Sequence, residues 1–196
     1  MNKKYREFIC DLINKIGQVP KEDREYFLSK LRVLKLNKNE HFIEAGDTQG
    51  PLGILYSGVL RVYLPDAEGK EKNLFFRTSG DFEGVYSPYF QPYENKIWFS
   101  TQAITNSEIL YFTQEDLEDL KKNFNCWNMF ELYIFQVRNV QMENRILSIL
   151  TQDAQSRYEL FLEEYPDLYN LIPQYQIASY IGINQVSLSR IRSMIK

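Results

Sequence analysis

Residues 173–196 read PQYQIASYIGINQVSLSRIRSMIK and are expected to form two short helices joined by a tight turn. Ile177, Ala178 and Ile181 give the first helix an apolar face, and Gly182 follows as a residue suited to end it. This spacing predicts a helix-turn-helix, whose second helix enters the major groove of DNA. The same pattern also fits an αα-hairpin that has no nucleic-acid role.

The second helix of this motif begins after Asn184, which is a plausible N-cap. Its inner side is expected to hold Val186, Leu188, Ile191 and Ile195. Its other side carries Gln185, Ser187, Ser189, Arg190 and Arg192. Amide, hydroxyl and guanidinium groups of this kind are the ones that contact base edges and phosphates.

Charge favours the DNA-binding interpretation. Residues 173–196 contain three basic and no acidic side chains, whereas the whole chain carries −3, so residues 1–172 carry −6. A basic end on an acidic protein is typical of phosphate contact. A charge of +3 is modest, so we expect two copies of the motif to act together.

Composition excludes several other classes of protein. The chain has 196 residues and 44% hydrophobic content. It has no apolar run long enough for a membrane span, and its N-terminus lacks the apolar core of a signal peptide, so we expect a cytoplasmic protein. Two distant cysteines, Cys10 and Cys126, give no metal spacing and no disulfide framework. With His41 as the single histidine and no nucleophile–base pair, we expect no metal site and no enzyme.

Short strands are predicted from about residue 33 to 112. Alternating apolar residues are separated by turns such as Pro65 to Gly69 and Ser79 to Asp81. Strands at this spacing indicate a small antiparallel β-roll or barrel. Two helices, near 3–18 and 21–31, are expected to cover it, and Thr113 is expected to cap a further helix.

A long helix is predicted from Cys126 to about Gln152. One stripe on it, the predicted seam, follows heptad spacing: Phe130, Tyr133, Val137, Val140, Asn144 and Leu147. A second apolar stripe holds Leu132, Phe135, Met142, Ile146 and Ile149. We expect one stripe to pack on the chain's own sheet and the other on a second copy; the alternative is that both face one core.

The order of these parts resembles the Crp/Fnr-type bacterial transcription regulators over nearly the whole length. The resemblance rests on YSGVLRVY at 56–63, Gly80-Asp81-Phe82, and IASYIGIN at 177–184 with SLSRI at 187–191. It implies an α+β protein with a cyclic-nucleotide-binding-like antiparallel β-roll, a long dimerisation helix and a C-terminal winged-helix DNA reader. The predicted domains are 1–125, 126–152 and 153–196, and the chain ends before a wing hairpin.

The resemblance also implies roles in DNA recognition. Arg190 stands where the family has a base-reading arginine, and Gln185 where some members have another base reader. Val186 replaces the acidic residue of the best-known member, so a different operator is expected. The predicted DNA-binding set is Gln174, Asn184, Gln185, Val186, Ser187, Ser189 and Arg190.

The effector site departs from the family pattern. Val85 stands where cyclic-AMP-binding members have a glutamate, and Ile97 near where they have an arginine, so we expect no cyclic AMP binding. Glu83 and Lys96 are substitutes if the alignment shifts. The effector pocket is predicted to involve Gly80, Phe82, Glu83, Gly84, Val85, Tyr86, Ile97 and Phe99. Its ligand would be flat or apolar, or the roll is filled and binds none.

The sequence thus predicts a homodimeric, sequence-specific DNA-binding regulator with no assigned cofactor. The alternative is a ligand-binding or protein-interaction module that keeps the helix-turn-helix without specific DNA binding. The expected partners are double-stranded DNA and a second copy, with RNA polymerase left open and no membrane. The effector, the operator, the regulated genes, activation or repression, and sensing by Cys126 or His41 are not determined by the sequence.

Overall fold

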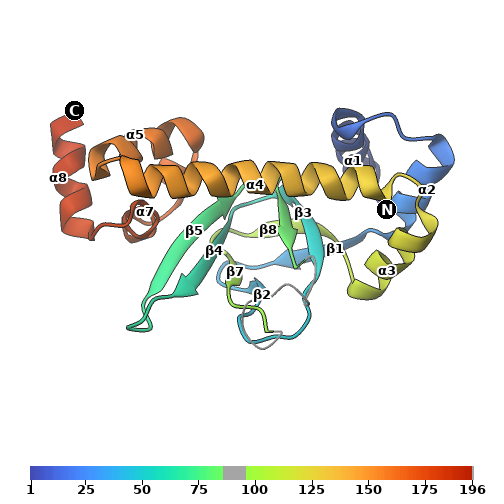
Figure 1. Ribbon diagram of the computed structural model, residues 1–196, viewed down its shortest axis with the longest axis horizontal. Helices are drawn as coiled ribbons and strands as arrows, with labels where there is room; N and C mark the ends of the chain where they lie inside the picture. Colours follow the sequence, from blue (N-terminus) through green and yellow to red (C-terminus); the bar gives the residue numbers. More distant parts are fainter. Residues whose placement is uncertain (86–95, 196) are drawn as a thin grey trace. The chain divides into compact units, whose positions relative to one another are not determined.

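The computed structural model describes residues 1–85 and 96–195, and Figure 1 shows their helices and strands. Contacts divide the chain into two compact units. Unit 1 contains Met1–Val62 and Phe76–Val137, and unit 2 contains Tyr63–Phe75 and Arg138–Lys196. The division passes through one long helix and two strands, whereas the predicted domains ended at residues 125 and 152.

Two helices open unit 1, as the sequence predicts. Helix α1 spans Lys3–Ile16, and the side chain of Asn2 accepts a hydrogen bond from the Lys4 amide at its start. Helix α2 spans Lys21–Lys30, directly after Pro20. Proline is well placed there because the first helical turn has no internal acceptor for its amides.

Within the part of the chain that the structure describes, eight strands form two four-stranded antiparallel sheets in the orders β1-β8-β3-β6 and β2-β7-β4-β5. Register is fixed by pairs such as Leu34 with Ile109 and Ile54 with Leu110. The strands are β1 Arg32–Leu36, β2 His41–Ile43, β3 Leu52–Ser57, β4 Leu60–Pro65, β5 Glu71–Arg77, β6 Phe82–Gly84, β7 Ser100–Ala103 and β8 Ser107–Phe112. The predicted β-roll is confirmed.

The turns of the roll explain its short sequence motifs. The Pro65 to Gly69 turn closes with the amide of Asp66 donating to Lys70 O at 2.8 Å. Gly58 has φ +92, and a Cβ there would lie 2.6 Å from Asn106 O. The Ser-Gly pair at 57–58 therefore requires glycine for both its backbone angle and the close approach of the next turn.

Helix α3 spans Gln114–Asn123 and begins with a capping box between Thr113 and Asp116, which confirms the predicted cap. Helix α4 spans Trp127–Thr151. In unit 1, α1, α2, α3 and the first turns of α4 pack against the sheet that contains β3 and β8, around a core of aromatic and aliphatic side chains (Figure 1). That core includes Ile9, Phe27, Leu110, Trp127 and Phe130.

Unit 2 holds the end of α4 and four more helices: α5 Ala154–Glu164, α6 Leu168–Leu171, α7 Gln174–Ile181 and α8 Gln185–Ile195. Asp153 caps α5 by accepting from the Ser156 amide at 2.8 Å. The hairpin arm at residues 63–75 belongs to this unit. Among the described residues, no helix is long and apolar enough to cross a membrane.

Candidate nucleic-acid interface

Helices α7 and α8 meet at a turn that the local sequence dictates. Gly182 adopts the left-handed conformation, with φ 82 and ψ 33, and its amide donates to Ala178 O at 3.0 Å. The Ile183 amide also donates to Ala178 O at 3.0 Å. Asn184 Oδ1 then accepts from the Ser187 amide at 2.8 Å, which satisfies a donor in the first turn of α8. The predicted turn and cap are confirmed.

Leu188 anchors α8 to the rest of the motif, since it is almost fully buried, as are Ile177 and Ile181 on α7. Val186 is 64% exposed, so its predicted place on the inner side is wrong. The reason is helical geometry: Val186 lies two positions before Leu188, and residues two apart do not share a face. Ile183 and Ile191 are half-buried.

The outward face of α8 carries most of the predicted DNA-binding side chains. Gln185, Val186, Ser189 and Arg190 are exposed, at positions that share one side of the helix. Ser187 is half-exposed, and Asn184 is exposed at the helix start. Gln174, at the start of α7, is half-buried, and its side-chain oxygen is buried without a hydrogen-bond partner.

The cations of the motif have different roles. Arg192 donates to the Tyr169 hydroxyl and lies 5.0 Å over that ring, so it stabilises the unit. Arg190 is exposed on the same side as Gln185. Lys196 lies outside the described residues. The outward face therefore presents one guanidinium beside an amide and a hydroxyl, a set that suits base edges and phosphates.

In the roll, the structure pairs the predicted pocket residue Glu83 with a residue that sequence reasoning missed. Arg77 Nε donates to Glu83 Oε2 at 2.7 Å, and both side chains are almost fully buried. Thr101 Oγ1 donates to Glu83 Oε1 at 3.3 Å. Glu83 lies on β6 and both partners lie on strands of the other sheet, so this cluster joins the two sheets inside the roll. Its signal in the sequence was an arginine directly after the apolar residues Leu74, Phe75 and Phe76.

Phe82 does not belong to the predicted effector pocket. Its side chain packs with Phe27, Phe112 and Trp127 in the core beneath the helices. Neighbouring side chains of a strand point to opposite faces, so Phe82 faces the helices while Glu83 faces the roll interior. The prediction for Phe82 is therefore wrong.

Val85 and Ile97, the positions that lack the family's charged residues, pack close together. A Cβ on Gly50 would lie 2.8 Å from Val85 Cγ2 and 3.2 Å from Ile97 Cδ1, and both side chains are buried. Two more of the predicted pocket residues are buried: Phe99, whose ring lies beside that of Trp98, and Gly84. Gly80 lies in a turn, and Lys96, named as a substitute cation, is exposed. Tyr86 lies outside the described residues.

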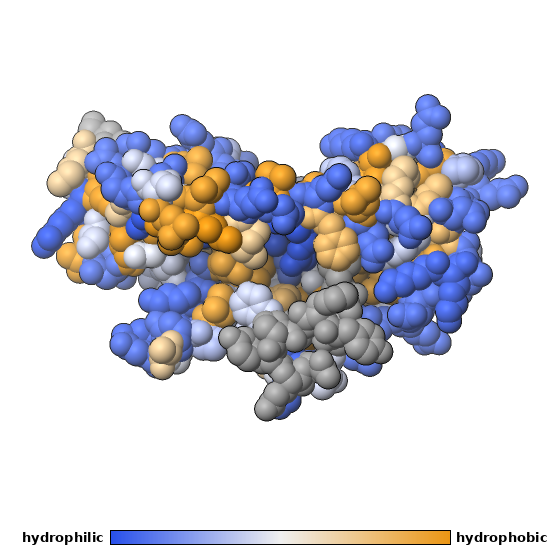
Figure 2. Space-filling view, in the orientation of Figure 1, coloured by the Kyte–Doolittle hydropathy of each residue, from blue (hydrophilic) through white to orange (hydrophobic). Residues whose placement is uncertain are grey.

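The structure distributes the predicted seam residues of α4 unevenly. Phe130 is buried in the core of unit 1, so its place in a seam between copies is wrong. Tyr133 and Val137 are half-buried, whereas Val140, Asn144 and Leu147 are exposed. Figure 2 shows apolar residues gathered along the C-terminal part of α4. The exposed α4 stripe consists of Leu132, Phe135, Val140, Ile146, Leu147, Ile149 and Leu150.

The residues considered as redox or metal sensors have ordinary surroundings. Burial and the carboxylate of Asp23, 3.4 Å away, raise the pKa of the Cys126 thiol, which disfavours the reactive thiolate. His41 Nδ1 lies 3.7 Å from Glu44. Within residues 1–85 and 96–195, no group of three or more potential ligand side chains could hold a metal ion.

Comparison with known proteins agrees with this architecture. Residues 33–124 match the model of the cyclic nucleotide-binding domain. The match covers the two sheets and the helix that follows them, and it says nothing of the helices in unit 2. No curated protein sequence matches this chain.

Solved structures extend the likeness to most of the chain. The structure of FixK2 from Bradyrhizobium japonicum matches this chain with a TM-score of 0.73 and 17% sequence identity, and the match covers 84% of each chain. The c-di-GMP-responsive global regulator CLP from Xanthomonas campestris has TM-score 0.70 and 17% identity, covering 90% of this chain and 91% of that one. A CRP/FNR-family regulator from Thermus thermophilus has TM-score 0.60 and 15% identity, covering 84% and 85%. The chain has the fold of the Crp/Fnr transcription regulators.

Proposed function

We propose that this protein is a homodimeric, sequence-specific DNA-binding transcription regulator that does not respond to cyclic AMP. The observation that carries the proposal is the construction of α8. Leu188 anchors the helix, while Gln185 and Arg190 stand exposed on its outer side. No acidic residue lies between positions 173 and 196 to repel phosphates.

The exposed α4 stripe supports the dimer. Leu150 is 75% exposed, and six further apolar side chains on the same helix are about half exposed or more. A contiguous apolar stripe of this size on a helix is typical of a protein–protein interface. A second copy would cover it and provide the second recognition helix. Two such helices would read half-sites about 34 Å apart, one turn of DNA.

A ligand-binding or interaction module that kept the helix-turn-helix without specific DNA binding is the second candidate. It is favoured by one feature, the low positive charge of the motif, since Arg192 is engaged with Tyr169. The two candidates differ in whether a defined DNA sequence is bound.

The test begins with selection of bound sequences from a random DNA pool by the full chain. Arg190→Ala is then expected to abolish retention of the selected operator in a mobility-shift assay. Arg190→Lys keeps the charge but loses the guanidinium fork, so it should retain nonspecific binding and lose discrimination at one base pair, by about 1–3 kcal/mol. Lys122→Ala, which removes an exposed cation on α3, serves as the charge-matched control.

If Arg190→Ala binds the operator as tightly as Lys122→Ala does, the reading role of α8 is wrong. If no sequence is enriched by the wild-type chain while α8 remains folded, the interaction-module candidate replaces the regulator. The helical signal of the Arg190 variants in circular dichroism separates that result from unfolding.

We also expect no cyclic AMP binding in the roll. Val85 and Ile97 are packed apolar side chains where a cyclic phosphate and a ribose would need charged partners, and Glu83 is already paired with Arg77. A buried phosphate without a cation would cost several kcal/mol. Titration calorimetry with cyclic AMP and cyclic GMP should show no saturable heat. Sub-micromolar binding of either nucleotide would contradict this assignment.

A further inference from the structure

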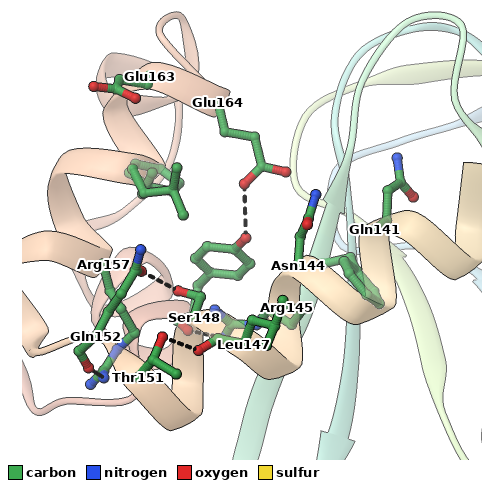
Figure 3. A pocket seen from close by; sticks show the side chains of 14 residues that line it. Gln141, Asn144, Arg145, Leu147, Ser148, Thr151, Gln152, Arg157, Glu163 and Glu164 are labelled. Atoms are coloured by element: carbon green, nitrogen blue, oxygen red, sulfur yellow. Dashed lines mark hydrogen bonds between the residues drawn. The ribbon is translucent and has the colours of Figure 1, made fainter.

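Unit 2 contains a cavity of about 570 Å³ (Figure 3). Its walls come from the last turns of α4, from α5, from α7 and from Phe75 on the hairpin arm. All of these residues belong to the same compact unit. Its size falls within the range of small-molecule sites.

Arg145 on α4 is the unusual group in this cavity. The residue is only 8% exposed, and its guanidinium carbon lies 4.0 Å from the centroid of the Tyr180 ring. One terminal nitrogen donates to the Tyr180 carbonyl oxygen. Nε is buried and has no hydrogen-bond partner among the described residues. The Glu164 carboxylate stabilises this charge electrostatically but does not form a hydrogen bond or salt bridge with the guanidinium. A buried donor left without an acceptor is costly, so the unsatisfied Nε in a cavity wall indicates an acceptor that is supplied from outside.

The other charged groups around the cavity already have protein partners or lie at its edge. Arg157 donates through Nε to Ile181 O at 2.8 Å and through a terminal nitrogen to Gln152 O at 2.6 Å. Glu164 accepts from the Tyr180 hydroxyl at 3.1 Å, and Glu163 is exposed. Arg157 thus has acceptors on both sides of its guanidinium, whereas Arg145 keeps a buried Nε with no acceptor among the described residues.

The rest of the lining defines the shape of the occupant. Phe75, Leu160 and Phe161 provide an apolar wall. Ser148 Oγ donates to Gln152 Oε1 at 2.7 Å, and Thr151 Oγ1 donates to Leu147 O at 2.7 Å, so both hydroxyl protons already have acceptors and an acid group would be held by Arg145. The lining suits a molecule with one acid group and an apolar body.

We propose that this cavity binds a small organic anion whose carboxylate or phosphate accepts hydrogen bonds from Arg145 and whose apolar body packs against Phe75, Leu160 and Phe161. The site shares no residue with the predicted effector pocket, and it does not depend on the proposed DNA binding. Tyr180 lies on α7, the first helix of the helix-turn-helix. A ligand held by Arg145 therefore stabilises the arrangement of α4, α5 and α7.

The experiment uses the full chain and three probes: benzoate, phenyl phosphate and the neutral benzamide. Binding is measured by ligand-observed NMR and by the shift in thermal unfolding temperature. At least one anion is expected to bind and benzamide is not. Benzoate alone, or phenyl phosphate alone, would identify which acid group the site accepts. Arg145→Gln should weaken anion binding about tenfold or more, because a charge-assisted hydrogen bond is lost.

Leu160→Trp gives a second test that leaves Arg145 in place. Leu160 is 37% exposed at the cavity wall, so a larger ring should block the site without disturbing the buried core. Leu171→Trp, at an exposed leucine on α6, is the matched control and should bind the anion as the wild type does.

The proposal is overturned if neither anion binds, if benzamide binds as well as benzoate, or if binding survives both Arg145→Gln and Leu160→Trp. Anion binding by a monomeric variant but not by the wild-type chain would also overturn it, because a second copy would then occupy the cavity. DNA selection with Arg190 variants is independent of these measurements, so either proposal can fail alone.

Discussion

Two buried charged residues, Glu83 and Arg145, differ in how the protein stabilises their charge. Glu83 is held by Arg77 at 2.7 Å and by Thr101 at 3.3 Å, so its charge is neutralised within the roll. Arg145 contacts a carbonyl oxygen and an aromatic face, and the Glu164 carboxylate acts on it only at longer range. Burial accordingly lowers the pKa of Arg145. The first arrangement joins two sheets, whereas the second leaves a cation in a cavity wall.

A surface carboxylate gives a pH-dependent prediction. Hydrogen bonds from Lys30 and then Tyr26 lower the pKa of Asp119 from 3.8 to about 2. The folded state thus favours the ionised form, so its stabilising effect is present above pH 3.8 and is lost as the pH falls to about 2. Asp119→Asn should therefore destabilise the protein above this window and make no difference below it. The measurement is urea unfolding at several pH values.

Asp11→Asn, which changes an exposed carboxylate on α1, is the control for that series. This series shows what removal of a carboxylate does without the contacts to Lys30 and Tyr26. If the difference between Asp119→Asn and the wild type did not change with pH, the contact of α3 with Lys30 and Tyr26 on α2 would not be maintained in solution.

At the scale of elements, the hairpin arm and α7 are joined by contacts between residues far apart in the sequence. Asn73 Nδ2 donates to Gln176 O at 3.0 Å, and both residues are almost fully buried. The Asn73 amide donates to Ser179 Oγ at 3.0 Å, and Ser179 Oγ donates to Glu71 O at 3.2 Å. The first helix of the motif thus satisfies polar groups of β5, as buried backbone groups require.

The turn between α7 and α8 gives the prediction at this scale. Gly182 has φ +82, and a Cβ there would meet nothing within 4 Å, so only backbone strain opposes a substitution. Gly182→Ala should lower the free energy of unfolding by about 1–2 kcal/mol, and Gly182→Asn by less, because asparagine tolerates the left-handed region. Urea unfolding of both variants checks this order.

Ser189→Ala, at an exposed position of α8, is the reference for that comparison and should be close to neutral. A Gly182→Ala chain as stable as Ser189→Ala would mean that the turn does not hold the left-handed conformation. If Gly182→Asn lowered the free energy of unfolding more than Gly182→Ala does, a steric contact and not backbone strain would oppose the substitution.

The element scale also separates what could be predicted from what could not. Local signals predicted the Thr113 capping box, the Pro65 to Gly69 turn and the Asn184 cap, because each depends on a few adjacent residues. Sequence reasoning missed the partner of Glu83, since Arg77 lies on a different sheet. It also misassigned Phe82, because only the position of β6 in the sheet shows which face the residue occupies.

At the scale of the whole molecule, α4 has two roles along its length. Its first turns bury Trp127, Phe130 and Ile134 in unit 1. Its later turns expose Ile146, Leu147 and Leu150. Leu132 and Phe135 are exposed as well, so α4 buries one apolar face in unit 1 and leaves other apolar side chains uncovered along its length. Such a helix is suited to bind the same helix of a second copy.

The dimer prediction follows from that stripe. The double variant Ile146→Glu/Leu150→Glu places two carboxylates on the proposed interface and leaves the cavity lining unchanged, so it should shift the protein from dimer to monomer in sedimentation velocity. The affinity for the operator should fall in the monomeric variant, because only one helix-turn-helix, with its charge of +3, then contacts the DNA. The single variant Leu171→Glu makes the same change of residue type on α6 and should remain dimeric.

A double variant that stayed dimeric would place the interface elsewhere. A wild-type chain that was monomeric at operator-binding concentrations would contradict the homodimer while leaving the α8 prediction standing. Each result is therefore assigned to one part of the proposed function.

The sequence by itself determined the order of the elements, their caps and turns, and the character of α8, because these depend on spacing and on residue types within a few positions. Only the tertiary structure decided that Val186 is exposed, that Phe130 is buried, that Arg77 pairs with Glu83 and that Arg145 lines a cavity. The physical reason is common to all four. Burial and charge pairing depend on which distant segments meet, and a pattern along one segment carries no information about the segment that packs against it.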